Sequence, residues 1–320
     1  MSLPVLPRRA ATAALLATPF LPRRARAAET VRIGLPTKTY WPTILAETAQ
    51  RRKLFEKEGI AAELTVYRGG AEAFEALAAG AADLVLDPPS LVATGLTKGI
   101  DSRVVATGAL RYLGWHLMVR DDSPINDVTG LAGKKVGITS AGSGSDLLAL
   151  WTQAEHKIQF TRVPLGGGGL VPNLRSRNVD AVVLYSPLSF QLVHAKQARS
   201  LIDYATAVPP HLNGGWIATQ AAITGKRAMV QKGLNALYGG LMALRADRAM
   251  ALSLISEIDD IPPEIAAFEY EQTILKLATD ATIDPPTVRL ALELAKLGGM
   301  TDMAPYEKVF DASFTVVPTT

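Results

Sequence analysis

Two segments of the chain repeat one another, and this repeat limits the fold more than any other feature. Residues Arg68–Ser90 read RGGAEAFEALAAGAADLVLDPPS, and residues Leu165–Pro187 read LGGGGLVPNLRSRNVDAVVLYSP. They align without a gap, and Asp83 corresponds to Asp180. Each copy contains a glycine turn, a short helix, and an Asp that opens an apolar strand ending in Pro and Ser. The repeat therefore predicts a duplicated supersecondary unit.

Each repeat is the second half of a βαβαβ unit, at about residues 30–90 and 134–187. Strands that alternate with helices form parallel sheets with right-handed crossovers. The apolar segments 114–119 and 214–219 are expected to cross between two lobes, and residues 226–256, 263–278 and 285–297 are expected to be helices that return to cover the first lobe. The sequence thus predicts an α/β protein of two lobes, each a βαβαβ-based sheet flanked by helices, with a helical C-terminal tail. The predicted boundaries are residues 28–113 with 217–320 for lobe I and 114–216 for lobe II.

The N-terminal 27 residues have the composition of a signal peptide. They contain five arginines and no acid, so the remaining chain has 28 bases against 30 acids and offers no basic surface for nucleic acid. Arg8-Arg9 precede a short apolar stretch, and Ala25-Arg26-Ala27 is a small-x-small cleavage pattern. We expect export to the periplasm by the Sec or the twin-arginine route, with a disordered basic tail as the alternative. The chain has no cysteine, so we expect no lipid anchor and no disulfide.

The predicted lobes would face each other with the loops that follow their strands, where open parallel sheets bind ligands. Three of the four tryptophans lie in these loops, and several tyrosines accompany them. Aromatic walls with a few polar anchors are typical of small-molecule sites, although such aromatics also seal hinges. The candidate ligand-binding residues are Thr39, Tyr40, Trp41, Pro88, Ser90, Trp115, Ser140, Ser143, Gly144, Ser145, Tyr185 and Trp216.

The segment VGITSAGSGSD, Val136–Asp146, leads from a strand through a Ser/Gly loop into a helix. Free N–H groups and the dipole at a helix start favour an anionic or polar group, so Ser140, Ser143, Gly144 and Ser145 are candidate anchors. Plain N-capping is the alternative for these serines. Two basic residues near the loops, Arg68 and Arg111, are candidate counter-charges unless they are simply solvated.

Motifs for catalysis and cofactors are missing from the sequence. No lysine follows the glycines as a nucleotide P-loop requires, and Leu147 stands where a dinucleotide fingerprint needs its third glycine. No G-x-S-x-G elbow is present, and the four histidines lack metal-ligand spacing. We therefore expect no catalytic residue, no metal and no cofactor. Asp83 and Asp180, at matched strand starts, are expected to have a structural turn or cap role.

The segments ALAAGAADLVLDPPS (Ala76–Ser90), LAGKKVGITSAGSGS (Leu131–Ser145) and RSRNVDAVVLYSP (Arg175–Pro187) resemble substrate-binding proteins of ABC transporters. The similarity is to the group that binds aliphatic sulfonates, taurine, nitrate and thiamine-pyrimidine precursors. Gly80 supplies a glycine that this group often has three residues before the strand-opening Asp, whereas Arg177 replaces it in the second copy. The resemblance implies a type II periplasmic binding protein fold, a monomer that closes on a small ligand, and docking on a membrane permease driven by an ATPase.

Two alternatives to transport remain open from the sequence. An exported sensor subunit would present its ligand to a receptor kinase. One branch of the group is an enzyme that makes the thiamine pyrimidine with a cysteine-rich motif, and the lack of cysteine argues against that branch. The ligand itself is left open between sulfonates, aromatic carboxylates, nitrate and pyrimidines.

Overall fold

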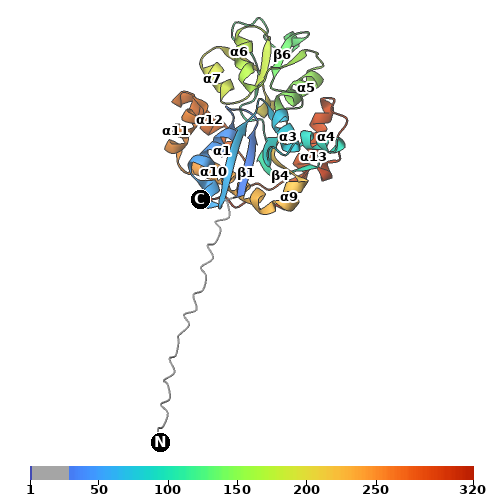
Figure 1. Cartoon of the computed structure of the whole chain (residues 1–320). Helices are drawn as coiled ribbons and strands as arrows, with labels where there is room; N and C mark the ends of the chain where they lie inside the picture. Colours follow the sequence, from blue (N-terminus) through green and yellow to red (C-terminus); the bar gives the residue numbers. More distant parts are fainter. Residues whose placement is uncertain (2–28) are drawn as a thin grey trace.

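The computed structural model describes residue 1 and residues 29–320, and it contains two five-stranded mixed sheets flanked by helices (Figure 1). The predicted signal peptide lies outside the described residues. The first sheet has the order β2-β1-β3-β10-β4 and the second has the order β7-β6-β8-β5-β9. We call each sheet with its flanking helices the first or second lobe. The strands are β1 (Glu29–Leu35), β2 (Ile60–Val66), β3 (Leu84–Asp87), β4 (Ser102–Ala109), β5 (His116–Arg120), β6 (Lys135–Ile138), β7 (Thr161–Pro164), β8 (Ala181–Leu184), β9 (Ala198–Asp203) and β10 (Gly214–Thr219).

The helices connect the parallel strands and continue as a C-terminal tail. They are α1 (Trp41–Arg51), α2 (Leu54–Lys57), α3 (Gly70–Ala78), α4 (Pro89–Thr97), α5 (Gly144–His156), α6 (Leu170–Arg175), α7 (Leu188–His194), α8 (Tyr204–Ala207), α9 (Gln220–Gly225), α10 (Arg227–Ala246), α11 (Arg248–Asp259), α12 (Pro263–Gln272) and α13 (Pro285–Leu297). Short 3-10 turns lie at Val128–Leu131, Gly167–Gly169, Ile274–Lys276 and Tyr306–Lys308. The α/β class, the two sheets and the helical tail are as the sequence predicts.

The matched aspartates hold equivalent positions in the two lobes. Asp83 Oδ2 accepts a hydrogen bond from the backbone N of Arg32 on β1 at 3.0 Å, and Asp180 Oδ2 accepts one from Lys135 N on β6 at 2.9 Å. Asp83 also pairs with the Arg32 guanidinium and with Lys226. Each carboxylate thus ties the start of a third strand to the first strand of the same unit, which confirms the structural role.

The segments expected to cross between the lobes are strands inside the sheets. β5 pairs antiparallel with β8 and β9, and β10 pairs antiparallel with β3 and β4. Both are almost fully buried because sheet neighbours cover their edges and helices cover their faces. The chain passes between the sheets at residues 110–115 and 204–213 instead, and we propose that the lobes divide within these two connections.

The tail covers the first lobe and also reaches the second. The predicted helix 226–256 is two helices, because Asp247 interrupts it and caps α11 by accepting from Met250 N at 3.0 Å. α10 packs on α1 and β1, as expected for the first lobe. α12 contacts α7 and α13 contacts α5, so the tail touches the second lobe on two opposite sides (Figure 1). Phe268 of α12 and Phe190 of α7 lie with ring centroids 6.3 Å apart.

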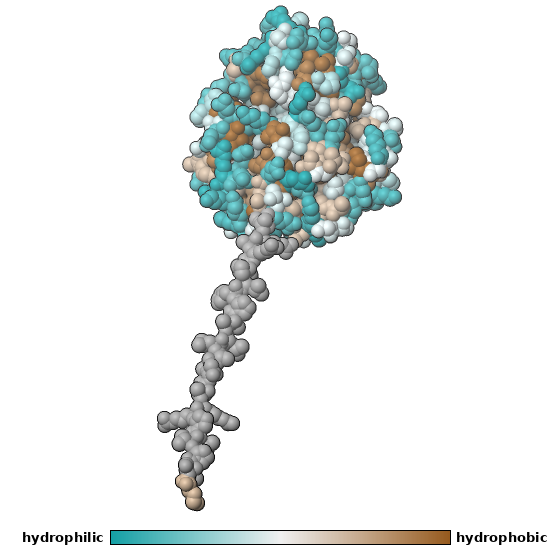
Figure 2. All heavy atoms as spheres, viewed as in Figure 1, coloured by the Kyte–Doolittle hydropathy of each residue, from teal (hydrophilic) through white to brown (hydrophobic). Residues whose placement is uncertain are grey.

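The visible surface is mostly hydrophilic, and its apolar residues form separate small groups (Figure 2). Within the part of the chain that the structure describes, we find no helix with the length and apolarity needed to cross a bilayer.

Candidate ligand-binding site

A small cavity lies between the two sheets where the strand-end loops of both lobes meet. The residues that line it are Pro36, Thr37, Tyr40, Gly70, Leu86, Asp87, Pro88, Tyr112, Trp115, Thr139, Ser143, Gly144, Tyr185, Asn213 and Gly214. Its volume is about 40 Å³. This space suits a few water molecules at most, whereas sites for organic ligands measure roughly 300–1,000 Å³.

Aromatic side chains from both lobes pack against one another at the cavity. The ring centroids of Tyr40, Trp115 and Tyr185 are 5.1 to 5.6 Å from one another. Trp115 Nε1 donates to Tyr40 Oη at 3.3 Å, and the Tyr112 ring lies 5.8 Å from Trp115. Tyr40 precedes a helix of the first lobe, whereas Tyr185 follows a strand of the second. The aromatic cluster therefore joins the lobes, and burial raises the pKa of Tyr185 to about 12, which keeps it neutral near pH 7.

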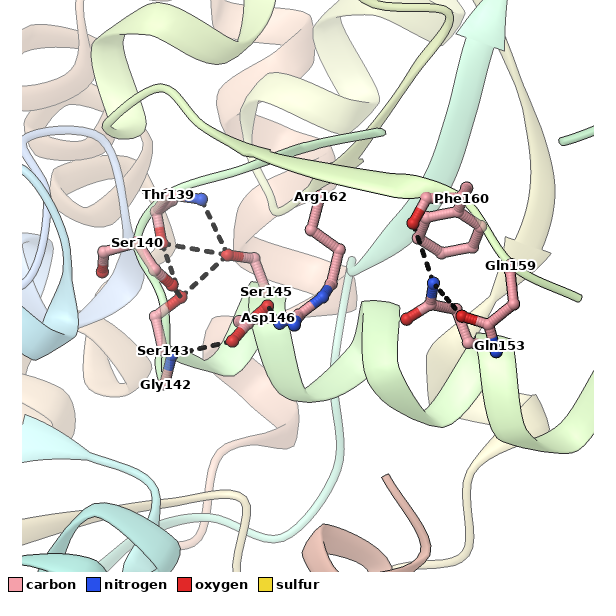
Figure 3. Close-up of polar contacts among 10 residues, drawn as sticks. All are labelled: Thr139, Ser140, Gly142, Ser143, Ser145, Asp146, Gln153, Gln159, Phe160 and Arg162. Carbon is pink, nitrogen blue, oxygen red and sulfur yellow. Dashed lines mark hydrogen bonds and ion pairs between the residues drawn. The ribbon is translucent and has the colours of Figure 1, made fainter. Parts of the chain in front are cut away.

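The Ser/Gly loop at the start of α5 is held by its own hydroxyl groups (Figure 3). Thr139 Oγ1 donates to Ser143 Oγ at 2.8 Å, and Ser143 Oγ donates to the carbonyl of Ser140 at 2.7 Å. Ser145 Oγ accepts from Thr139 N at 2.9 Å. Ser143 occupies the N-cap position of α5 but makes no side-chain cap bond to the helix. The loop is thus pre-shaped, with Ser143 and Gly144 at the cavity.

The acidic residue of this loop has a structural partner. Asp146 Oδ2 accepts from Gly142 N at 2.8 Å, and its other oxygen pairs with Arg162 on β7 (Figure 3). Asp146 is buried and does not line the cavity.

Half of the candidate residues from the sequence come together at the cavity. They are Tyr40, Pro88, Trp115, Ser143, Gly144 and Tyr185. Their arrangement follows from the topology, because the carboxyl ends of β1, β3, β6 and β8 lie at the facing edges of the two sheets.

The other six candidates lie elsewhere. Trp41 of α1 and Trp216 of β10 are packed in the hydrophobic core of the first lobe. Ser145 is fully buried under its loop, and Ser90 lines a separate cavity beside α13. Ser140 lines an open pocket with Arg68 on the outer side of the lobe contact, and Thr39 is half-buried in the loop before α1.

Neither candidate counter-charge lies at the cavity. Arg68 and Arg111 are exposed, and Arg111 Nη1 donates to the carbonyl of Ala205 at 3.2 Å. Within residues 29–320, no lysine or arginine lines the cavity.

Among the described residues, the acidic side chain that lines the cavity is Asp87, which is not one of the candidates predicted from the sequence. It ends β3, the residue is 3% exposed, and its Oδ2 has no hydrogen-bond partner. Burial raises its pKa well above the usual range. A Cβ at Gly70, the first residue of α3, would lie 1.9 Å from Asp87 Oδ1, so the glycine makes room for the carboxyl. The sequence feature that points to Asp87 is an acidic residue at the end of the apolar strand LVLD.

A cluster of buried polar side chains lies where the C-terminal tail meets the second lobe. Ser186 Oγ and Thr273 Oγ1 are hydrogen-bonded at 3.0 Å, and Thr273 Oγ1 donates to Glu269 Oε2 at 3.2 Å. Asp259 lies near Glu269, and both of its carboxylate oxygens lack partners. Burial raises the pKa of Glu269 to about 7 and that of Asp259 to about 8, the latter also through its neighbour Glu269.

The chain is similar in sequence to proteins of one family. The model described as NMT1/THI5 like matches residues 44–250. A Brucella abortus protein named as a binding protein is 30% identical over 187 residues, which cover 57% of this chain and 56% of that protein. The chain therefore matches little more than half the length of the curated relatives of this kind.

Solved structures share the fold over most of the chain. The alkanesulfonate-binding protein SsuA from Xanthomonas axonopodis pv. citri, bound to MOPS, superposes with a TM-score of 0.76 at 18% identity and covers 89% of this chain and 99% of its own. The desulfurization enzyme DszB gives 0.55 at 17% identity and covers 85% and 90%. This is the two-lobed type II fold that the sequence predicts.

Proposed function

Because the chain belongs to the NMT1/THI5-like family, we propose that it is the solute-binding component of an ABC-type importer and that it holds a small organic ligand between its two lobes. The observation that carries the proposal is the cavity that both lobes build from aromatic and polar strand-end residues. The name of the structural relative that binds alkanesulfonates supports the same role.

The aromatic cluster and the loop before α5 would contact different parts of the ligand. Tyr40, Trp115 and Tyr185 supply apolar faces for the body of the ligand, while Ser143 and the N–H groups at Gly144 suit a polar end. The proposed export route places the protein in the periplasm, where it would deliver the ligand to a membrane permease.

The small cavity implies a conformational step. A site of about 40 Å³ cannot hold an organic molecule, so the lobes must part or the aromatic rings must move before a ligand enters. A ligand that contacts both lobes favours the closed arrangement by the difference in its affinity for the two states. This requirement is compatible with the proposed binding by hinge closure.

The test is a thermal-shift screen on the full chain with sulfonates, aromatic carboxylates, nitrate, pyrimidines and amines, followed by titration calorimetry of the compounds that bind. Ser143→Trp places a large ring at the cavity wall and should abolish binding, and because Ser143 is buried and hydrogen-bonded in its loop, circular dichroism is used to show that the variant is folded before its affinity is compared. Ser253→Trp, on the exposed face of α11, is the matched control and should bind normally. Unchanged affinity in Ser143→Trp would show that the ligand does not bind at this cavity. Recovery of a bound compound in chemically altered form would favour an enzyme.

A further inference from the structure

The cavity has the charge pattern of a site for a cation. Its lining residues that titrate are Asp87 and the tyrosines Tyr40, Tyr112 and Tyr185. Burial raises the pKa of all three tyrosines, so they are neutral near pH 7. Asp87 is therefore the one acidic side chain among the described lining residues, and no described lysine or arginine lines the cavity to balance it.

The Asp87 carboxyl is placed to receive a donor. Oδ2 is buried and unpartnered, and an unpaired buried acceptor costs free energy that a ligand can recover. The other oxygen packs against Gly70 at the first turn of α3, where the helix dipole favours the ionised form. Burial opposes ionisation, so a positive ligand group would supply the missing stabilisation.

The rings around this carboxyl favour the same ligand charge. Aromatic faces attract cations through their quadrupole, and desolvation strengthens that attraction. Tyr40, Trp115 and Tyr185 surround the cavity that Asp87 lines. A sulfonate or nitrate seated against Asp87 would instead meet a carboxylate in a low-dielectric site, which is unfavourable.

Resting on the proposed function above, we propose that the ligand is an organic cation with an N–H-bearing ammonium or amidinium group, which pairs with Asp87 while Tyr40, Trp115 and Tyr185 enclose its apolar body. This assignment concerns the end of the ligand at Asp87. The start of α5, on the opposite lobe, contacts the far end of the molecule.

The experiment compares three probes that share a benzyl group and differ in charge, on the full chain by calorimetry: benzylammonium, benzyl alcohol and phenylmethanesulfonate. Benzylammonium should bind most tightly. Asp87→Asn keeps the shape and removes the charge, so it should weaken benzylammonium about 10- to 100-fold, the range of a charge-assisted hydrogen bond. Asp302→Asn changes the same charge on the surface and should leave binding unaltered.

The outcomes separate this assignment from the proposed function. Preference for phenylmethanesulfonate, as a neutral Asp87 donating to an anion would give, overturns the cation assignment and leaves the binding role intact. Benzylammonium binding that is absent, or equal in Asp87→Asn and the wild type, also overturns it. If the broad screen in addition finds no compound whose binding Ser143→Trp removes, the proposed function fails as well.

Discussion

The buried carboxylates Glu269 and Asp259 should make the stability of this protein fall as the pH rises from 5 to 7. The pKa of Glu269 rises from 4.5 to about 7 on folding, and that of Asp259 rises from 3.8 to about 8. At a pH between the unfolded and the folded pKa of either carboxyl group, the folded protein holds a proton that the unfolded chain has released. The free energy of unfolding therefore decreases with pH in this window, and the stabilisation is complete only below the unfolded pKa values.

The size of the effect follows from the shifts. Each pKa unit corresponds to about 1.4 kcal/mol, so each group should reduce the free energy of unfolding by about 2 kcal/mol between pH 5 and pH 7. Glu269→Gln is neutral at every pH and can still accept from Thr273, so its stability advantage over the wild type should grow by about 2 kcal/mol between pH 5 and pH 7. Asp259→Asn should behave in the same way.

The assay is urea denaturation followed by tryptophan fluorescence, at intervals of half a pH unit. Glu56→Gln, an exposed acid on α2, is the control and should keep the wild-type slope. Identical pH profiles for the wild type and Glu269→Gln would refute the reasoning, because they would show that Glu269 is ionised in the folded protein at pH 5.

Two further predictions concern residues that support the cavity or the two sheets. Both are tested by measuring the free energy of unfolding in urea. Gly70→Ala places a Cβ 1.9 Å from Asp87 Oδ1 and should destabilise the protein by about 1–3 kcal/mol, whereas an unchanged midpoint would show that the two residues are not in contact. Asp83→Ala should cost about 2–3 kcal/mol because it leaves a partly buried backbone donor and two cations without their partner, while Asp180→Ala removes one backbone bond and should cost about 1 kcal/mol. Equal losses at the two matched positions would contradict this ranking.

The sequence predicts the duplicated units well because their signals are local. A glycine turn, a short helix and a strand-opening aspartate recur at fixed spacing, and the backbone bonds of Asp83 and Asp180 show why an acid is useful at that position. The interior strands β5 and β10 are harder to place. Their partners are distant in the chain, so nothing in their own residues distinguishes an antiparallel interior strand from a connecting segment.

The candidate site is predictable at the level of loops but not of side chains. Tyr40 and Trp41 are neighbours, yet the first faces the cavity and the second enters the core as α1 begins. Which of two adjacent aromatics turns inward depends on the packing of the whole lobe. Asp87 is not predictable as a ligand-binding residue, because an acid at the end of a fully buried strand belongs to no binding motif. What distinguishes it is the free-energy cost of burying an acidic side chain.

The two contacts of the tail with the second lobe, α12 on α7 and α13 on α5, lie outside the cavity. In a protein that closes on its ligand, these contacts stabilise the closed state whether or not a ligand is present. Apparent affinity scales with the fraction of molecules that can bind, so a substitution at Phe190 or Phe268 would change affinity without altering a single ligand contact. Related chains with identical cavities can thus diverge in the solute concentration at which they respond, through mutations in a helix pair that never meets the solute.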